Sequence, residues 1–496
     1  MSKRLFLLLP LIIITTALVA QNGAGSAPKS TTPSKAPEGY NIPISVKPYK
    51  NTYVYLGYHY GKRKALADSA LLDENGKGVF KGPKPLGGGI YFVVSPKKEI
   101  LFELLIDKQQ HFSIEADSSS MPEGIKFTNS PDNTLFLSYT RNINETGRKA
   151  AEASQAFQNS TNPAEKEKLQ QLMQQHNQYV VKYRDSIQKK HPNTFLSTLL
   201  KAMKEPVIPP ASQHPGGKYD TMFAFRYFKS HYWDEVSLTD DRLLRTPILE
   251  TKLDKYYKDL VAPDPDSIFR EVDYMLLLSR SNKDMFRYLM VYFVQKYINP
   301  EYMGQDAVFV NIWEKYINTG QADFFTEQYK KHMSDRAYSL MANLIGIPAA
   351  ELLMVDTLGK PMPLSRVQAE FIVLCFWDPT CGHCKEVVPR VDSIFQASWK
   401  NQGVKVYGVM VEGGKDNWLK FIRENNLKDW LHVYQTEEQK NADIAAGKPS
   451  YRQLYDVYQT PVLYLLDKNK RIIAKKLNHQ QIDEVIKIKR QKPSNQ

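Results

Sequence analysis

Phe371-Ile-Val-Leu-Cys-Phe-Trp-Asp-Pro-Thr-Cys-Gly-His-Cys-Lys385 is the stretch that decides the fold of the last part of this chain. Its uninterrupted apolar run, 371–377, predicts a strand covered on both faces, as in the middle of an α/β sheet. An acidic residue, a proline and a threonine break the run, and Cys381 and Cys384 then open a predicted helix. The stretch therefore predicts a strand, a tight turn and a helix whose first turn carries two thiols.

The position of the two cysteines indicates a chemical role. A thiol at a helix N-terminus is stabilised as thiolate by the helix dipole and by free backbone N–H groups. The second thiol lies one turn later, close enough to close a disulfide. This geometry predicts a thiol–disulfide exchange site in which the Cys381–Cys384 pair is itself the redox centre and no cofactor is needed. No metal is expected, because a zinc site would need two further ligands.

The residues after Gly346 alternate between strand and helix patterns, which is typical of an α/β unit. We expect a hairpin over 354–364 ahead of the quoted strand, and a long helix from Cys381 to about Trp399. Further strands are predicted at 404–411, 462–466 and 471–476, and further helices at 416–426, 451–458 and from 480 onward, with a polar insertion at 436–448. Residues 346–496 are therefore expected to form one α/β domain.

This domain resembles the thioredoxin superfamily, most closely the TlpA/ResA-like branch of exported bacterial thiol–disulfide oxidoreductases. Phe376-Trp377 and Cys381-Gly-His-Cys-Lys385 stand where that family has its Phe-Trp pair and its active-site motif. Pro389 matches the proline that kinks the active-site helix, and Thr460-Pro461 matches the cis-proline beside the sulfurs. The parts ahead of it are more loosely similar to exported Bacteroidetes proteins that join domains of unknown function to a thioredoxin-like domain.

The resemblance implies a role for each cysteine of the motif. Cys381, nearest solvent, would be the attacking thiolate, and Cys384 would resolve the mixed disulfide. His383 would place an imidazole between them, which favours the thiolate when charged and makes the disulfide more oxidising.

Three further residues are expected at the substrate side of the site. Thr460 and Pro461 would lie against the sulfur pair, where the carbonyl before a cis-proline can pair with a bound substrate strand. Trp377 is expected either to wall the site or to serve simple packing.

Cys375 marks a departure from thioredoxin itself, which has a buried acid at this position to help the resolving cysteine lose its proton. Here a different group or water must accept the proton of Cys384, and Asp378 and Glu412 are candidates. Cys375 itself is expected to be a buried apolar thiol, and the sharper alternative is a third redox-active thiol able to capture Cys384.

The first residues have the layout of a signal peptide, predicted for 1–20: Lys3 and Arg4, an apolar run over 5–14, and small residues ending at Ala20. The alternative is an uncleaved N-terminal anchor. None of the three cysteines follows the apolar run where a lipoprotein would need one. Residues 21–39 are rich in Ala, Pro, Ser and Thr and predict a flexible leader. We expect a soluble protein exported to the periplasm or cell envelope, where disulfides persist.

Two further domains are predicted between the leader and the α/β domain. Residues 40–118 show short β-type runs separated by turn residues, which predicts an antiparallel β domain, with a sandwich as the expected form. The glycines at 87–89 precede a strand and lack a following Gly-Lys-Ser/Thr, so they indicate a turn rather than a phosphate loop. Residues 125–345 follow helical periodicity and predict an all-α domain.

The helical domain carries two patterns of note. In the helix that Asn162 is expected to cap, an apolar and aromatic stripe is predicted to lie on one face and to pack. Its members are Leu169, Leu172, His176, Tyr179, Tyr183 and Ile187. The aromatic residues between 223 and 233 fit either helix packing or a peptide-binding groove, and packing is the expected reading.

The net charge of +13 is interpreted as solvated surface, because no nucleic-acid-binding motif accompanies it. The leading hypothesis is an exported thiol–disulfide oxidoreductase that acts on protein thiols and disulfides through a mixed disulfide at Cys381. The rival is an envelope protein that binds a partner and uses the Cys pair as a structural or redox-sensing disulfide. A peroxidase is disfavoured by the spacing around Cys381. A membrane redox partner is implied by the resemblance, and both the direction of exchange and the oligomeric state stay open.

Overall fold

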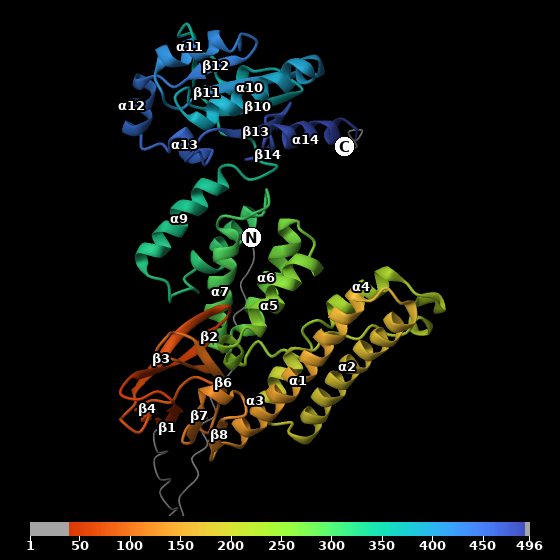
Figure 1. Ribbon diagram of the computed structural model, residues 1–496. Helices are drawn as coiled ribbons and strands as arrows, with labels where there is room; N and C mark the ends of the chain where they lie inside the picture. Colours follow the sequence, from red (N-terminus) through yellow and green to blue (C-terminus); the bar gives the residue numbers. More distant parts are fainter. Residues whose placement is uncertain (1–38, 492–496) are drawn as a thin grey trace, which may run out of the picture.

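The computed structural model describes residues 39–491, and within them the chain forms three parts that follow one another in sequence and in space (Figure 1). A β domain comes first, a helical region spans 131–341, and an α/β domain ends the chain. The predicted fold class is therefore confirmed. The predicted signal peptide and residues 21–38 of the predicted leader lie outside the described residues. Within 39–491 no helix combines the length and the apolar character needed to cross a membrane.

The β domain consists of two four-stranded sheets whose apolar faces pack on each other. One sheet has the order β4-β1-β7-β8 and the other β3-β2-β5-β6. The strands are β1 (Tyr40–Lys47), β2 (Tyr53–Tyr60), β3 (Arg63–Leu71), β4 (Lys77–Gly82), β5 (Gly89–Val94), β6 (Ile100–Ile106), β7 (Ser113–Asp117) and β8 (Ile125–Thr128). Alternation in β1 points Ile42, Ile44 and Val46 inward. One pairing departs from the expected antiparallel pattern, since β1 and β7 run parallel.

The glycines at 87–89 have a packing reason that the sequence pattern did not show. They lead into β5 where the β domain meets the helical region, and the side chains of Arg242 and Arg245 lie directly on their backbone. A Cβ atom on Gly87 would lie only 2.2 Å from the guanidinium carbon of Arg245. The turn is therefore glycine-rich because two arginines occupy the space of its side chains.

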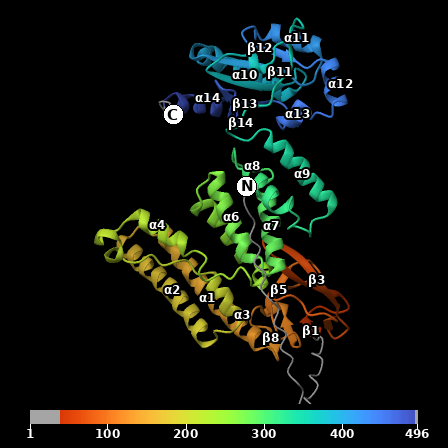
Figure 2. The same ribbon diagram turned by 180° about the vertical axis from the view of Figure 1, so that it is seen from behind.

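The helical region begins with two long antiparallel helices, which extend away from the rest of the molecule (Figures 1 and 2). The helices of the region are α1 (Pro131–Asn159), α2 (Pro163–Lys190), α3 (Phe195–Ala202), α4 (Thr221–Ser230), α5 (Ile248–Lys255), α6 (Pro265–Ser279), α7 (Lys283–Tyr297), α8 (Asp306–Ile312) and α9 (Glu327–Met341). Asn162 caps α2 as predicted, because its side chain accepts from the N–H of Ala164 at 3.0 Å.

The expected packing of the α2 stripe is correct only at one end of the helix. Ile187 is the residue of α2 that becomes buried, whereas Leu172 and Tyr179 remain 39% and 45% exposed. The reason is geometric: α2 packs chiefly along α1, and the outer turns of this pair extend past the core that α3 and α5–α9 form. The aromatic residues Tyr232 and Phe228, by contrast, belong to or pack on that core.

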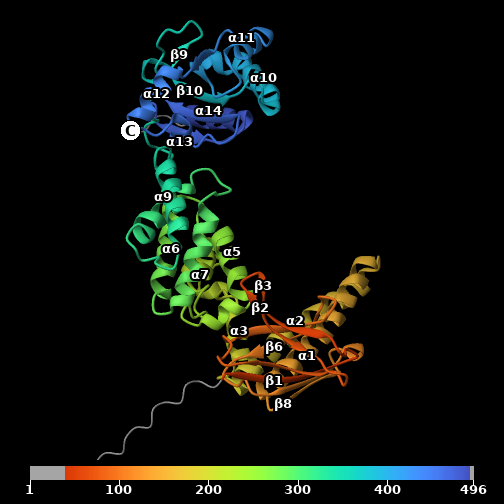
Figure 3. The same cartoon turned by 90° about the vertical axis from the view of Figure 1, so that its left-hand side faces the viewer.

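The α/β domain is a six-stranded sheet, β14-β13-β10-β11-β12-β9, with helices on both faces (Figure 3). The predicted buried strand β10 lies inside the sheet, parallel to β11 and antiparallel to β13. The elements are β9 (Val355–Asp356), β10 (Phe371–Trp377), α10 (Gly382–Ala397), β11 (Val404–Met410), α11 (Lys415–Glu424), β12 (Leu431–Tyr434), α12 (Glu437–Ala445), α13 (Tyr451–Leu454), β13 (Val462–Asp467), β14 (Ile472–Lys475) and α14 (His479–Gln491). All seven residues of β10 are buried, as the apolar run predicts.

The helical region and the α/β domain are joined by buried polar contacts around α9. Ser339 donates to the carbonyl of Gln453 at 2.6 Å, and the Asn343 amide donates to the carbonyl of Leu454 at 2.9 Å. Lys475 of β14 forms an ion pair with Asp306 of α8, and both side chains are almost fully buried. These contacts fix the α/β domain against the end of α9.

Candidate active site

The two cysteines of the motif lie where α10 begins, shortly after the end of β10. Cys381 is the N-cap residue of α10, so its side chain lies beside the free N–H groups of the first turn. The turn ahead of it is built on Asp378, whose carboxylate accepts from the N–H and the hydroxyl of Thr380 at 2.7 Å each. The turn therefore fixes where the helix begins and where the first sulfur lies.

Cys381 is the accessible thiol of the pair. Its Sγ lies 3.6 Å from the carbonyl oxygen of Thr460, and the Thr460–Pro461 peptide bond is cis. The backbone N–H of Cys384 is the main cause that lowers the pKa of Cys381, with the Thr460 contact and the backbone N–H of His383 adding to it. A partly exposed thiol with a lowered pKa at a helix N-terminus is suited to act as a nucleophile.

Cys384 has the opposite environment. It is fully buried, and burial raises its pKa to about 11. The backbone N–H of Asp378 donates to its Sγ at 3.4 Å. This thiol stays protonated while Cys381 ionises, so the two sulfurs differ in a way that fits an attacking and a resolving role.

Cys375 lies in the same apolar cluster as Cys384 and is fully buried. Burial raises its pKa far above the ordinary value, and the neighbouring Cys384 raises it further. This environment is that of an inert apolar thiol. A redox role for Cys375 stays a prediction.

His383 and Trp377 take up different positions relative to the sulfurs. His383 is exposed in the first turn of α10, and its side chain faces a cavity beside the motif. Trp377 is fully buried and packs against Phe421 and His432, with ring centroids 5.1 and 6.4 Å away. In this position Trp377 supports the site from below, which corresponds to packing rather than to a wall that touches substrate.

The two candidate proton acceptors also differ in position. Asp378 precedes the motif and already binds Thr380 through one carboxylate oxygen. Glu412 forms an ion pair with Arg452 and is largely exposed. Of the two candidate proton acceptors, Asp378 is therefore the one that lies in the turn leading into the cysteine motif.

An aromatic cluster beneath the site was missed by the sequence analysis. His432 of β12 stacks on Trp430 at 5.7 Å between ring centroids and donates from Nε2 to the carbonyl of Leu427 at 2.7 Å. Burial lowers the pKa of His432 to about 4. The strand that carries it has four residues, which is too short for a clear alternation in the sequence.

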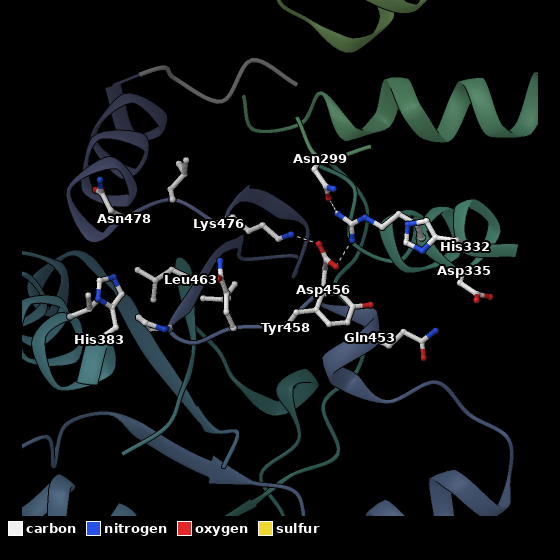
Figure 4. A pocket seen from close by; sticks show the side chains of 16 residues that line it. Asn299, His332, Asp335, His383, Gln453, Asp456, Tyr458, Leu463, Lys476 and Asn478 are labelled. Carbon is white, nitrogen blue, oxygen red and sulfur yellow. Dashed lines mark hydrogen bonds and ion pairs between the residues drawn. The ribbon is translucent and has the colours of Figure 1, made fainter. Parts of the chain in front are cut away.

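The cavity beside the motif is the second feature that the sequence analysis missed. It has a volume of about 760 Å³, and both His383 and Pro461 line it. Figure 4 shows that residues of the helical region, among them His332 and Asp335 of α9, line its opposite side. The structure thus brings Cys381, Cys384, Thr460 and Pro461 together and opens a cavity next to them.

Comparisons with known proteins give two family matches. Residues 369–472 match a family described as thioredoxin-like, and residues 161–339 match a family described as a domain of unknown function, DUF5106. No curated protein matches the chain.

Several solved structures are similar to the chain. A domain of a possible thiol-disulfide isomerase from Cytophaga hutchinsonii shares 36% identity, covering 30% of this chain and 94% of its own, with a TM-score of 0.27. A thioredoxin-like protein from Bacteroides caccae shares 21% identity, covering 58% of this chain and 99% of its own, with a TM-score of 0.44. A thiol:disulfide interchange protein from a Bacteroides species shares 21% identity, covering 31% and 95%, with a TM-score of 0.27.

Proposed function

We propose that this chain, which belongs to the thioredoxin superfamily through residues 369–472, is a thiol–disulfide oxidoreductase that exchanges disulfides with protein substrates through Cys381 and Cys384. The observation that carries the proposal is the contrast between the two thiols. The accessible Cys381 has a lowered pKa and lies 3.6 Å from the Thr460 carbonyl, while the buried Cys384 has a pKa raised to about 11.

The proposed exchange proceeds in two steps. The thiolate of Cys381 attacks one sulfur of a substrate disulfide, forms a mixed disulfide and releases the other substrate sulfur as a thiolate. Cys384 then loses its proton and attacks the Sγ of Cys381, which forms the internal disulfide and releases the second substrate thiol. Two electrons pass from the cysteine pair to the substrate, and the reverse sequence oxidises a substrate dithiol.

A redox titration tests this function. The purified protein is equilibrated across a glutathione series, alkylated and weighed by mass spectrometry. We expect one reversible two-electron transition that links Cys381 and Cys384. A midpoint near −250 mV or below would identify a reductant, and one nearer −180 to −120 mV an oxidant or isomerase, by comparison with known exchangers, as order-of-magnitude guides.

Two variants complete the test. Cys381→Ser should abolish exchange, and Cys384→Ser should accumulate the mixed disulfide with substrate. The proposal fails if the pair remains oxidised at potentials far below the glutathione range and Cys381→Ser exchanges disulfides as fast as the wild type. The disulfide would then be structural.

We further propose that the protein acts outside the cytoplasm and exchanges electrons with a membrane redox partner. The signal-like layout of residues 1–20 supports export, since disulfide exchange is needed in oxidising compartments. The mass of the protein recovered from the cell envelope tests this: loss of residues 1–20 is expected, and an intact N-terminus in the cytoplasmic fraction would contradict it.

A further inference from the structure

The cavity beside the cysteines is built from two domains. The α/β domain contributes His383 and Pro461 next to the sulfurs, and Lys476, which follows β14, farther along. The helical region contributes His332 and Arg336 of α9 to the lining. Figure 4 shows His332 on the wall that faces His383. A polypeptide bound at Thr460 and Pro461 would therefore run alongside a helix that the thioredoxin-like domain alone does not possess.

The facing wall is held in place by contacts of Arg336, which link α9 to the α/β domain. Arg336 of α9 forms an ion pair with Asp456 of the α/β domain, and its second guanidinium nitrogen donates to Asn299 at 3.0 Å. Burial alone would raise the pKa of Asp456, but hydrogen bonds from Lys476 and Arg336 outweigh it and lower the pKa. Asp456 therefore stays charged, and the ion pairs fix α9 relative to the catalytic residues.

The group formed by Arg336, Lys476 and Asp456 holds one positive charge more than it holds negative charges. Arg336 and Lys476 both bind the single carboxylate of Asp456, which is 1% exposed. Asp335, the other acidic residue in the lining, pairs with Lys331 at 3.0 Å. One positive charge is left over, and it lies at Lys476, whose side chain is 41% exposed and whose ammonium has donors beyond the one that Asp456 accepts.

Apolar residues lie between the catalytic end and this charge. Val387, Val462, Leu463 and Leu477 line the cavity together with Pro461. In Figure 4, Leu463 lies between His383 and Lys476, and α9 closes the far side. The cavity thus presents, in order, an end at His383 and Pro461 beside the cysteine motif, an apolar section and a cationic group.

We infer that this cavity is a substrate subsite that receives the polypeptide segment next to the reacting cysteine, and that it selects segments with an acidic side chain placed to reach Lys476. The inference rests on the proposed function and gives it a substrate class: extended segments with an apolar residue near the cysteine and a carboxylate beyond it. The helical region supplies the wall that makes this selection possible.

Peptides whose single cysteine is joined to 2-mercaptoethanol test the charge. The peptides are made in pairs that differ at one position, where one peptide carries Glu and the other Gln. Each of the first four positions on either side of the cysteine is tested in turn. At one position, the wild type should react with the Glu peptide roughly two- to five-fold faster, the range for a partly exposed ion pair. Lys476→Gln should abolish this preference. Lys470→Gln is the matched control, since Lys470 has the same left-handed backbone (φ 62° against 56°) and lies outside the cavity.

A second pair of variants tests the wall. His332→Trp fills the cavity from α9 and should slow the peptides several-fold, while Gln328→Trp, four residues earlier on α9, exposed and outside the lining, should not. Bis(2-hydroxyethyl) disulfide, which is small and uncharged, should react equally with all five proteins. Equal rates for Glu and Gln peptides with the wild type, or peptide rates that His332→Trp leaves unchanged, would overturn the inference.

Binding without reaction separates the inference from the proposed function. Peptides with Ser in place of Cys are titrated by fluorescence anisotropy against the same variants. A Glu preference that depends on Lys476, together with no reaction of bis(2-hydroxyethyl) disulfide, would retain the subsite and reject the oxidoreductase. Exchange with the small disulfide but no Glu preference in binding would retain the oxidoreductase and reject the subsite.

Discussion

At the scale of single residues, the site depends on the different environments that one turn of helix gives to two identical side chains. Cys381 lies at the N-cap and is accessible, whereas Cys384, three residues later, is buried beneath it. Backbone N–H groups lower the pKa of the first, and burial raises the pKa of the second. Backbone N–H groups at Cys381 and burial at Cys384, rather than a charged neighbour, are the main sources of the difference.

This asymmetry predicts the order of alkylation. With the reduced protein at pH 7, iodoacetamide should modify Cys381 first, because its lowered pKa gives it the larger thiolate fraction. The rate at which Cys381 is modified should reach its plateau at a lower pH than that of an ordinary cysteine, whose pKa is about 8.5. Peptide mass spectrometry across pH 5 to 10 measures both. Labelling of Cys384 or Cys375 at a similar rate would contradict the assignment of the nucleophile.

His432 predicts a loss of stability in acid. Its pKa of about 4 in the folded protein is below the ordinary 6.5, so the folded state holds fewer protons. The associated stability is present above pH 6.5 and is lost as the pH falls towards 4, by about 3 kcal/mol in all. Urea unfolding followed by tryptophan fluorescence should show this decline. His432→Gln should flatten it between pH 6.5 and 4, and an unchanged slope would show that other groups cause it.

Residue-level prediction from sequence succeeded where a motif fixes the local geometry. Cys381, Cys384, Thr460 and Pro461 are brought together as the resemblance implied, although Thr460 is 79 residues from Cys381. The same reasoning missed His432 and Arg336. Each acts through contacts with distant segments, and neither stands in a local pattern that signals such contacts.

At the scale of elements, α1 and α2 show how far periodicity can be trusted. The stripe on α2 correctly predicts a helix, but periodicity indicates only that one face is apolar and not what covers it. In the folded chain α1 covers part of that face, and the outer turns remain exposed. In the α/β domain β10, β11, β13 and the four-residue β14 were predicted, whereas β12, which also has four residues, was not.

Two alanine substitutions in α2 measure this difference. Ile187→Ala removes a side chain that is 4% exposed and should lower the free energy of unfolding by about 2–4 kcal/mol. Leu172→Ala, on the same predicted stripe but 39% exposed, should change it by less than about 0.5 kcal/mol. Chemical denaturation of both variants provides the comparison. Equal losses would indicate that the outer turns are covered in solution.

At the scale of the whole molecule, buried ionic and polar contacts join the helical region to the α/β domain. Lys475 is paired with Asp306 and also donates to the carbonyl and the side-chain oxygen of Asn343, at 2.8 Å each. A buried charge that loses its partner is costly, whereas an apolar pair of similar size is not. The two domains are therefore expected to unfold together.

Asp306→Ala tests this coupling. It leaves Lys475 buried without its carboxylate and should cost about 3–5 kcal/mol. Calorimetry should then resolve an earlier, separate transition for one of the domains. The double variant Asp306→Leu, Lys475→Met should recover most of the loss. A single unchanged transition in Asp306→Ala would show that the remaining contacts suffice.

The position of Cys375 inside β10 has a consequence for how the molecule can be observed. Its sulfur is enclosed on an interior strand, so a reagent can reach it only when the sheet transiently opens. Its rate of labelling, with Cys381 and Cys384 held as a disulfide, then counts those openings in the way that amide hydrogen exchange does. The labelling rate of Cys375 therefore reports how often the native state opens transiently, without an engineered probe.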